Sequence, residues 1–143
     1  MHVVILGCGR VGANLANLLD SEGHDVSIID RNSDQFRRLD PDFRGTAIVG
    51  TGIDQEILRR AGIEQADHFI AVTNGDNTNV MAAQVAQRVF HVPRVICRIY
   101  DPVREETYRN LGLETYCPTT LGTAMVRQLK EKPLPAAGAR PGR

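Results

Sequence analysis

A glycine-rich turn directly after a short apolar segment constrains the fold of this chain more than any other sequence feature. The segment His2-Val3-Val4-Ile5-Leu6 is rich in β-branched residues, as in a strand buried on both faces. Gly7, Gly9 and Gly12 follow it and precede apolar residues at helical spacing. In this GxGxxG pattern the first glycine allows the tight turn, the second lets a phosphate approach the backbone, and the third lets the helix pack on the strand. The pattern predicts a nucleotide-binding Rossmann turn; a strand–helix turn that binds nothing is the alternative.

The next strand-like segment, Val26–Asp30, ends in a carboxylate. Asp30 lies 18 residues beyond Gly12, close to the spacing of about 20 at which an acidic residue accepts hydrogen bonds from the ribose hydroxyls of a dinucleotide. A carboxylate there would repel a 2′-phosphate, so NADP is disfavoured. The alternative is that Asp30 only begins a turn before Arg31 and Asn32.

Apolar strand-like segments alternate with helix-like segments along the chain, which is typical of an α/β protein with a parallel sheet. We therefore predict a Rossmann-type doubly wound parallel sheet of about six strands in the order 3-2-1-4-5-6, with helices on both faces. The strands are expected at residues 2–6, 26–30, 46–49, 68–72, 94–99 and 114–117.

Helices are expected between these strands. The first runs from the glycine turn to residues 21–23. A short second helix passes through residues 36 and 39 and is capped by Asn32 or Ser33, and a third spans residues 55–61 and is capped by Asp54. Two more are expected at residues 79–90 and 102–111. A last helix begins at Pro118 and carries Leu121, Met125 and Leu129 on one face. Residues 1–130 are predicted to form the nucleotide-binding domain, and 131–143 a flexible tail or truncation point.

Polar residues at the carboxyl ends of the predicted strands are further candidates for ligand contacts. Arg10 follows Gly9 and would pair with a phosphate, and Arg31 would stack on the adenine; a solvated surface position is the alternative for both. Thr73, Asn74 and Asn79 lie where the fourth strand ends. Asp76 and Thr78 are expected to cap the following helix instead. Arg98, at the end of the fifth strand, would reach a phosphate or a second ligand.

Composition narrows the class of protein. The 143 residues contain 42% hydrophobic and 24% charged residues, a globular balance, and the formal net charge is zero. A neutral chain has no general electrostatic reason to bind nucleic acid. Its three cysteines and four histidines show no metal-ligand or disulfide spacing, so no metal site and a reducing cytoplasmic setting are expected.

The chain resembles the N-terminal nucleotide-binding domain of potassium-conductance regulators, the RCK or KTN (TrkA-N) domains of Trk-type potassium-uptake systems. The resemblance spans roughly residues 1–130. It is carried by VVILGCGRVG at 3–12, VSIIDRN at 26–32, DQEILRRAGIEQAD at 54–67, AVTNGDNTN at 71–79 and VICRIYDPVRE at 95–105.

The resemblance implies a regulatory subunit rather than an enzyme. It would be a cytoplasmic homodimer, possibly within an octameric ring, held at the inner face of the membrane by a potassium channel or transporter, with ATP, ADP or NAD(H) as its regulatory ligand. The expected nucleotide-binding residues are Gly7, Cys8, Gly9, Arg10, Val11, Gly12, Asp30, Arg31, Gly50, Thr51, Thr73, Asn74, Asn79 and Arg98.

The chain departs from the family at two points. The family usually has Gly-Asp after the third strand, where this chain has Gly50-Thr51-Gly52, and its regulators usually carry a second ligand domain. Two other functions stay open: the NAD-binding domain of a dehydrogenase without its catalytic domain, and an interaction module with a vestigial pocket. The last helix either docks on its own sheet or, since the expected helices already lie on both sheet faces, packs part of its apolar stripe on a second subunit.

Overall fold

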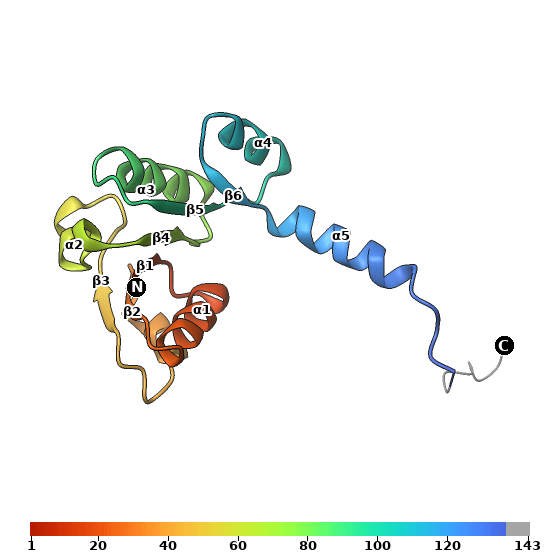
Figure 1. Ribbon diagram of the computed structural model, residues 1–143, viewed down its shortest axis with the longest axis horizontal. Coiled ribbons are helices and arrows are strands. Elements are labelled where there is room, and N and C mark those ends of the chain that lie inside the picture. The colour runs from red at the N-terminus through yellow and green to blue at the C-terminus, as the bar shows by residue number, and fades with distance from the viewer. Residues whose placement is uncertain (137–143) are drawn as a thin grey trace.

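The computed structural model describes residues 1–136 and contains one parallel sheet of six strands in the order β3-β2-β1-β4-β5-β6 (Figure 1). This is the predicted doubly wound Rossmann-type order. All strands are parallel, and the order in which they are added to the sheet reverses between β1 and β4. The strands are β1 His2–Leu6, β2 Asp25–Asp30, β3 Thr46–Val49, β4 His68–Ala71, β5 Arg94–Arg98 and β6 Glu114–Tyr116.

Helices connect the strands, as parallel pairing requires. Asp54 and Asp101 cap the helices that follow them by accepting backbone N–H groups, and Asn32 does the same for a 3-10 helix, which settles the choice between Asn32 and Ser33. The helices are α1 Arg10–Ser21, η1 Ser33–Arg38, α2 Gln55–Arg60, η2 Ile63–Gln65, α3 Asp76–Arg88, α4 Pro102–Asn110 and α5 Pro118–Lys130.

The largest departure from the expected boundaries is at α3, which begins at Asp76 and not at residue 79. Asp76 and Thr78 do not cap this helix, because its N-cap is Gly75 and no side chain accepts from its first turn. The Asp76 carboxylate instead accepts the backbone N–H of Tyr100 at 2.9 Å. The prediction that these two residues cap the helix is therefore wrong, and Asp76 ties α3 to the loop after β5.

Two apolar cores lie on the two faces of the sheet. On one face, α2, α3 and α4 cover the strands, and Phe69 and Leu58 are fully buried there. On the other face, α1 and η1 pack over β1 and β2, around Ile5 and Ile28.

The half of this second face formed by β4, β5 and β6 is covered by no helix among the described residues. Ile70, Ile96 and Tyr116 point toward it. The predicted helices lie on both faces, but α1 and η1 reach only half the width of the sheet.

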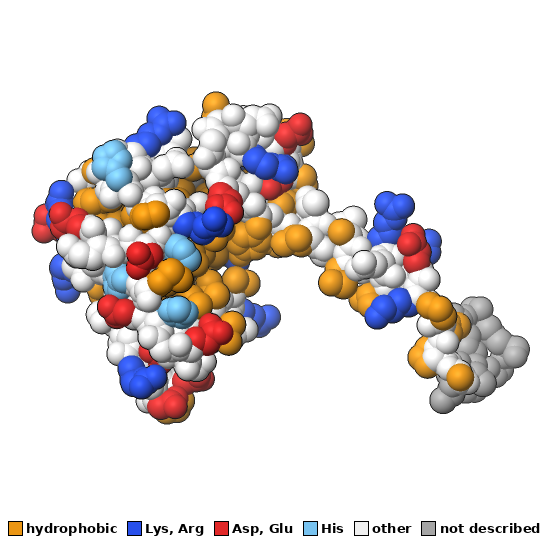
Figure 2. Space-filling model, viewed as in Figure 1, with side chains coloured by type: hydrophobic (Ala, Val, Ile, Leu, Met, Phe, Trp, Pro, Cys, Tyr) orange, Lys and Arg blue, Asp and Glu red, His pale blue; other side chains and the backbone are white. Residues whose placement is uncertain are grey.

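Helix α5 projects away from the body of the domain (Figure 1). From Thr119 onward its residues are exposed, including Leu121, Met125, Val126 and Leu129, and hydrophobic side chains lie along it and where it leaves the body (Figure 2). Among residues 1–136, no helix is long and apolar enough to cross a membrane. Part of the predicted tail, residues 137–143, lies outside the described residues.

Candidate functional site

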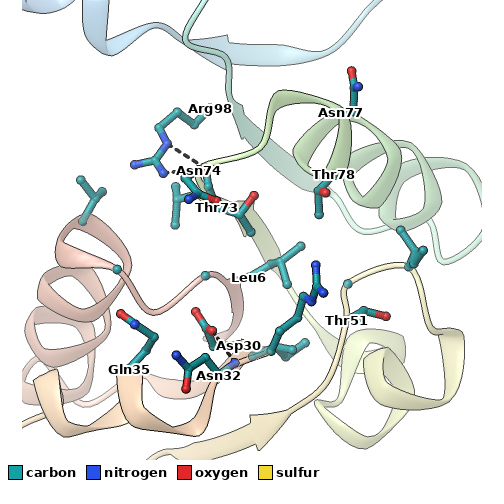
Figure 3. Close-up of a pocket in the computed structure, with 18 of the residues that line it drawn as sticks. Leu6, Asp30, Asn32, Gln35, Thr51, Thr73, Asn74, Asn77, Thr78 and Arg98 are labelled. Atoms are coloured by element: carbon teal, nitrogen blue, oxygen red, sulfur yellow. Dashed lines mark hydrogen bonds between the residues drawn. The ribbon is translucent and has the colours of Figure 1, made fainter.

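A cleft of about 1000 Å³ opens at the carboxyl ends of the central strands, where the strand order reverses. Its size suits a nucleotide or another small ligand. Figure 3 shows two groups of polar side chains on either side of Leu6. Asp30, Asn32, Gln35 and Thr51 form one group, and Thr73, Asn74, Asn77, Thr78 and Arg98 form the other.

The glycine turn forms one wall of the cleft. Gly7 adopts φ +108°, a conformation that side chains disfavour, and its N–H donates to Ile29 O at 2.7 Å. A Cβ on Gly12 would lie 1.8 Å from Gly7 O, so Gly12 permits the close contact between helix and turn. A Cβ on Gly9 would meet nothing within 4 Å, and Gly9 lines the cleft. The turn thus keeps open space where the fingerprint places phosphates.

Asp30 holds the turn in place. One carboxylate oxygen accepts the backbone N–H of Cys8 at 2.8 Å, and the other accepts that of Asn32 at 2.9 Å. The bond to Asn32 is the turn contact considered as the alternative for this residue, so Asp30 begins a turn and also faces the cleft. Two charge-assisted bonds fix the orientation of the carboxylate.

Asn79 organises the opposite wall. Its side chain is fully buried, with Oδ1 accepting the backbone N–H of Thr73 at 2.9 Å and the Thr73 hydroxyl at 2.7 Å. Its Nδ2 donates to Thr73 O and to Arg98 O. These contacts fix the ends of β4 and β5 relative to α3 and leave the Asn79 amide no group for a ligand.

Arg98 places an unneutralised charge in this wall. The residue is 8% exposed, and its Nε and Nη2 donate to Thr73 O at 3.2 and 2.6 Å (Figure 3). Its guanidinium carbon lies 4.7 Å from the centroid of the Tyr100 ring. No carboxylate of residues 1–136 forms an ion pair with it. Because a buried charge is costly without a counter-charge, an anionic ligand would stabilise this arrangement.

The cleft as a whole is suited to an anion. Arg10, Arg31 and Arg98 line it against a single acidic residue, Asp30. Both α1 and α3 begin at its edge with a glycine N-cap and no side-chain cap. Their first-turn N–H groups and positive helix ends therefore face the cleft without a protein acceptor.

The structure separates the fourteen sequence-predicted residues into two sets. Four do not line the cleft: Cys8 contributes its backbone to the turn, Gly12 packs the helix, Gly50 packs against Ile57, and Asn79 is a buried bridge. The others lie at the cleft: Gly7, Gly9, Arg10, Val11, Asp30, Arg31, Thr51, Thr73, Asn74 and Arg98.

Sequence reasoning overlooked Gln35, Met81 and Tyr100, which also line the cleft. Tyr100 follows the end of β5, so the rule that pointed to Arg98 could have found it. Gln35 and Met81 lie within helices, and only their packing brings them to the cleft.

Two of the buried thiols, those of Cys8 and Cys97, remain protonated at neutral pH. Burial is the main cause that raises the pKa of Cys8 to about 11, with a smaller contribution from the Asp30 charge. Burial likewise raises the pKa of Cys97 to about 12. Because only the thiolate is reactive, both groups are inert at neutral pH.

Comparison with known proteins gives consistent matches. The TrkA-N domain family matches residues 3–117. The chain is 53% identical over 115 residues to the Trk system potassium uptake protein TrkA of Streptomyces coelicolor, covering 80% of this chain and 52% of that protein. It is 37% identical over 114 residues to the TrkA homolog of Methanothermobacter thermautotrophicus, again covering 80% and 52%. The chain thus spans about half the length of these relatives.

Solved structures share the fold. The TrkA-N domain of the Escherichia coli inner membrane protein ybaL superposes with a TM-score of 0.80 at 18% identity, covering 91% of this chain and 96% of that one. The GsuK channel bound to NAD gives a TM-score of 0.67 at 22% identity, covering 82% and 21%. GsuK bound to ADP gives 0.66 at 21% identity, covering 81% and 31%.

Proposed function

Because this chain belongs to the TrkA-N domain family, we propose that it binds an adenine nucleotide, namely ATP, ADP or NAD(H), in the cleft between β1 and β4. The observation that carries the proposal is the Arg98 guanidinium, which is buried in the cleft wall without a carboxylate partner among the described residues. Phosphate groups of a nucleotide would supply the missing negative charge.

The placement of the nucleotide follows from the two walls. The phosphates would lie over Gly9, at the uncapped start of α1, with Arg10 and Arg98 as counter-charges. The ribose would meet the Asp30 carboxylate, which backbone N–H groups already orient. NADP is disfavoured in this arrangement, because its 2′-phosphate would approach Asp30. The NAD and ADP in the two GsuK structures support these ligand classes.

We propose that the bound nucleotide regulates a membrane potassium channel or transporter from its cytoplasmic side. The two relatives compared above are named as a Trk system potassium uptake protein and its homolog, and GsuK is named as a channel. The protein would then be a regulator and not an enzyme. The family and the names of its relatives favour this role over a dehydrogenase fragment, for which NADH turnover would be the discriminating observation.

A homodimer would give the regulator a second state to switch between. Two apolar surfaces remain partly exposed within residues 1–136: the stripe on α5 and the half-sheet face on which Ile96 and Tyr116 are only partly buried. In a two-fold dimer, α5 of each subunit would cover a surface of the other. A nucleotide that binds two dimer geometries with different affinity would shift the balance between them.

The ribose placement is tested by comparing NAD and NADP in calorimetric titrations. We expect NADP to bind at least about tenfold more weakly than NAD. Asp30→Ala should weaken NAD binding by about 1.5–3 kcal/mol, the usual value for hydrogen bonds to a charged group. Asp34→Ala is the matched control, because Asp34 is exposed and does not line the cleft. Equal affinities for NAD and NADP would contradict the ribose contact.

A further inference from the structure

We propose that the base end of the cleft does not select adenine and that it accepts a 6-oxopurine nucleotide, such as a guanine or hypoxanthine nucleotide, with comparable affinity. The inference rests on the proposed nucleotide site and concerns its specificity. It comes from the hydrogen-bonding groups that the cleft leaves free where the base would lie.

The base end is fixed by the other two parts of the ligand. With phosphates over Gly9 and the ribose at Asp30, the base extends over the ends of β2 and β3. Polar side chains there belong to Asn32, Gln35 and Thr51, which lie on the same side of the cleft as Asp30 (Figure 3). Arg31 also lines this end.

Each side-chain acceptor of Asp30, Asn32 and Gln35 at this end accepts one hydrogen bond from the protein and keeps one further lone pair. Both carboxylate oxygens of Asp30 accept backbone N–H groups. Asn32 Oδ1 accepts the N–H of Asp34 at 3.0 Å, and Gln35 Oε1 accepts from the Arg38 guanidinium. These contacts orient both amides so that each presents its NH₂ group as the group without a partner among the described residues.

Thr51 and Arg31 do not change this excess of hydrogen-bond donors at the base end. The Thr51 side chain has no hydrogen-bond partner among residues 1–136, and its hydroxyl can rotate to donate or to accept. The Arg31 guanidinium can only donate. Asp30 is the only acidic residue that lines the cleft. The base end therefore offers several donors and one adaptable hydroxyl, but no free carboxylate.

Hydrogen-bond donors at the base end suit guanine better than adenine. The edge of guanine that carries N7 and O6 presents two acceptors, whereas the same edge of adenine presents the N7 acceptor and an N6 amino donor. A site that selects adenine needs an acceptor opposite the amino group. Here the Thr51 hydroxyl can accept from an amino group or donate to an oxo group, so it does not discriminate between the two.

Calorimetric titration of the full chain with ADP, GDP and IDP tests the proposal. IDP separates recognition of the 6-oxo group from any contact to the 2-amino group of guanine. We expect GDP and IDP to bind no more than about fivefold more weakly than ADP, since a single neutral hydrogen bond changes affinity by about two- to tenfold. A larger preference for ADP would overturn this inference and leave the proposed function standing. Failure of all three nucleotides to bind would overturn both.

A variant tests the role of Thr51 directly. Thr51→Asp supplies a side chain that can only accept, so we expect the ratio of GDP to ADP dissociation constants to rise by at least about tenfold. Thr51→Ser keeps the hydroxyl and should leave the ratio unchanged. The ratio cancels any general effect of the new charge on phosphate binding. An unchanged ratio in a folded Thr51→Asp variant would overturn the proposal, because Thr51 would then not face the base.

Discussion

Gly9 and Gly12 lie three residues apart in the same turn, yet a methyl group would meet opposite surroundings at the two positions. At Gly12 it would lie 1.8 Å from Gly7 O, whereas at Gly9 nothing lies within 4 Å. Gly9 has φ −75°, which alanine adopts readily. Gly12 therefore allows α1 to pack against the turn, whereas Gly9 leaves space for a ligand to approach the backbone.

We expect Gly12→Ala to lower the free energy of unfolding by about 1–3 kcal/mol or more, because the turn must move to relieve the overlap. Gly9→Ala should cost at most about 1 kcal/mol, the scale of an N-cap change. It should nevertheless weaken ADP binding at least about tenfold, since its methyl group enters the phosphate space. Urea unfolding and calorimetry measure the two effects. Undiminished ADP binding by Gly9→Ala would contradict the phosphate placement.

Sequence reasoning at the residue scale succeeds where local geometry determines the role. The arrangement of the glycine turn and the acidic end of β2 follow from short-range spacing. Asn79 was expected at the ligand, but the structure places it in a buried bridge between Thr73 and Arg98. Asn79 and Arg98 lie 19 positions apart, and one sequence gives no sign of such a contact.

At the scale of elements, α5 is the helix whose apolar stripe packs against nothing else among residues 1–136. Leu121, Met125 and Leu129 recur every four residues and are all more than half exposed. Thr123 lies on the opposite side of the same helix, between Leu121 and Met125 in sequence. The two sides of α5 thus allow a matched pair of charge substitutions.

We expect Met125→Glu to convert a dimer to a monomer, because a buried carboxylate without a partner is costly at an apolar interface. Thr123→Glu should leave the dimer intact. Light scattering on the purified proteins at tens of micromolar measures the difference, with circular dichroism to verify that both variants fold. If the unchanged protein is itself a monomer under these conditions, the dimer proposal is wrong.

Hydrophobic periodicity predicts where helices and strands lie. Where each of them begins and ends depends on tertiary contacts, which periodicity does not reveal. The start of α3 was placed at residue 79, three residues late, because the polar run Asp76-Asn77-Thr78 looks like a turn in sequence. The structure uses Asp76 to bind the loop after β5 and so extends the helix. The 3-10 helix η2 was not expected, because three residues carry no periodic signal.

For the whole molecule, the order of the strands could be predicted because parallel crossovers have one preferred hand. The coverage of the sheet could not be predicted, since it depends on where each helix lies across the face. Only the structure shows that the β4–β6 half of one face has no helix over it among residues 1–136. In the proposed regulator, this uncovered face and the projecting α5 would connect the nucleotide cleft to an assembly.

The central claim, that a nucleotide binds in the cleft at the reversal of strand order, is tested most directly by ADP titration of the ¹⁵N-labelled chain. The account predicts saturable shifts of the amide resonances of Gly7, Gly9 and Asn74, which line the cleft. The amides of Gly23 and Gly112, which follow α1 and α4 and do not line it, should not move. Unchanged Gly7 and Gly9 resonances at millimolar ADP would contradict the account.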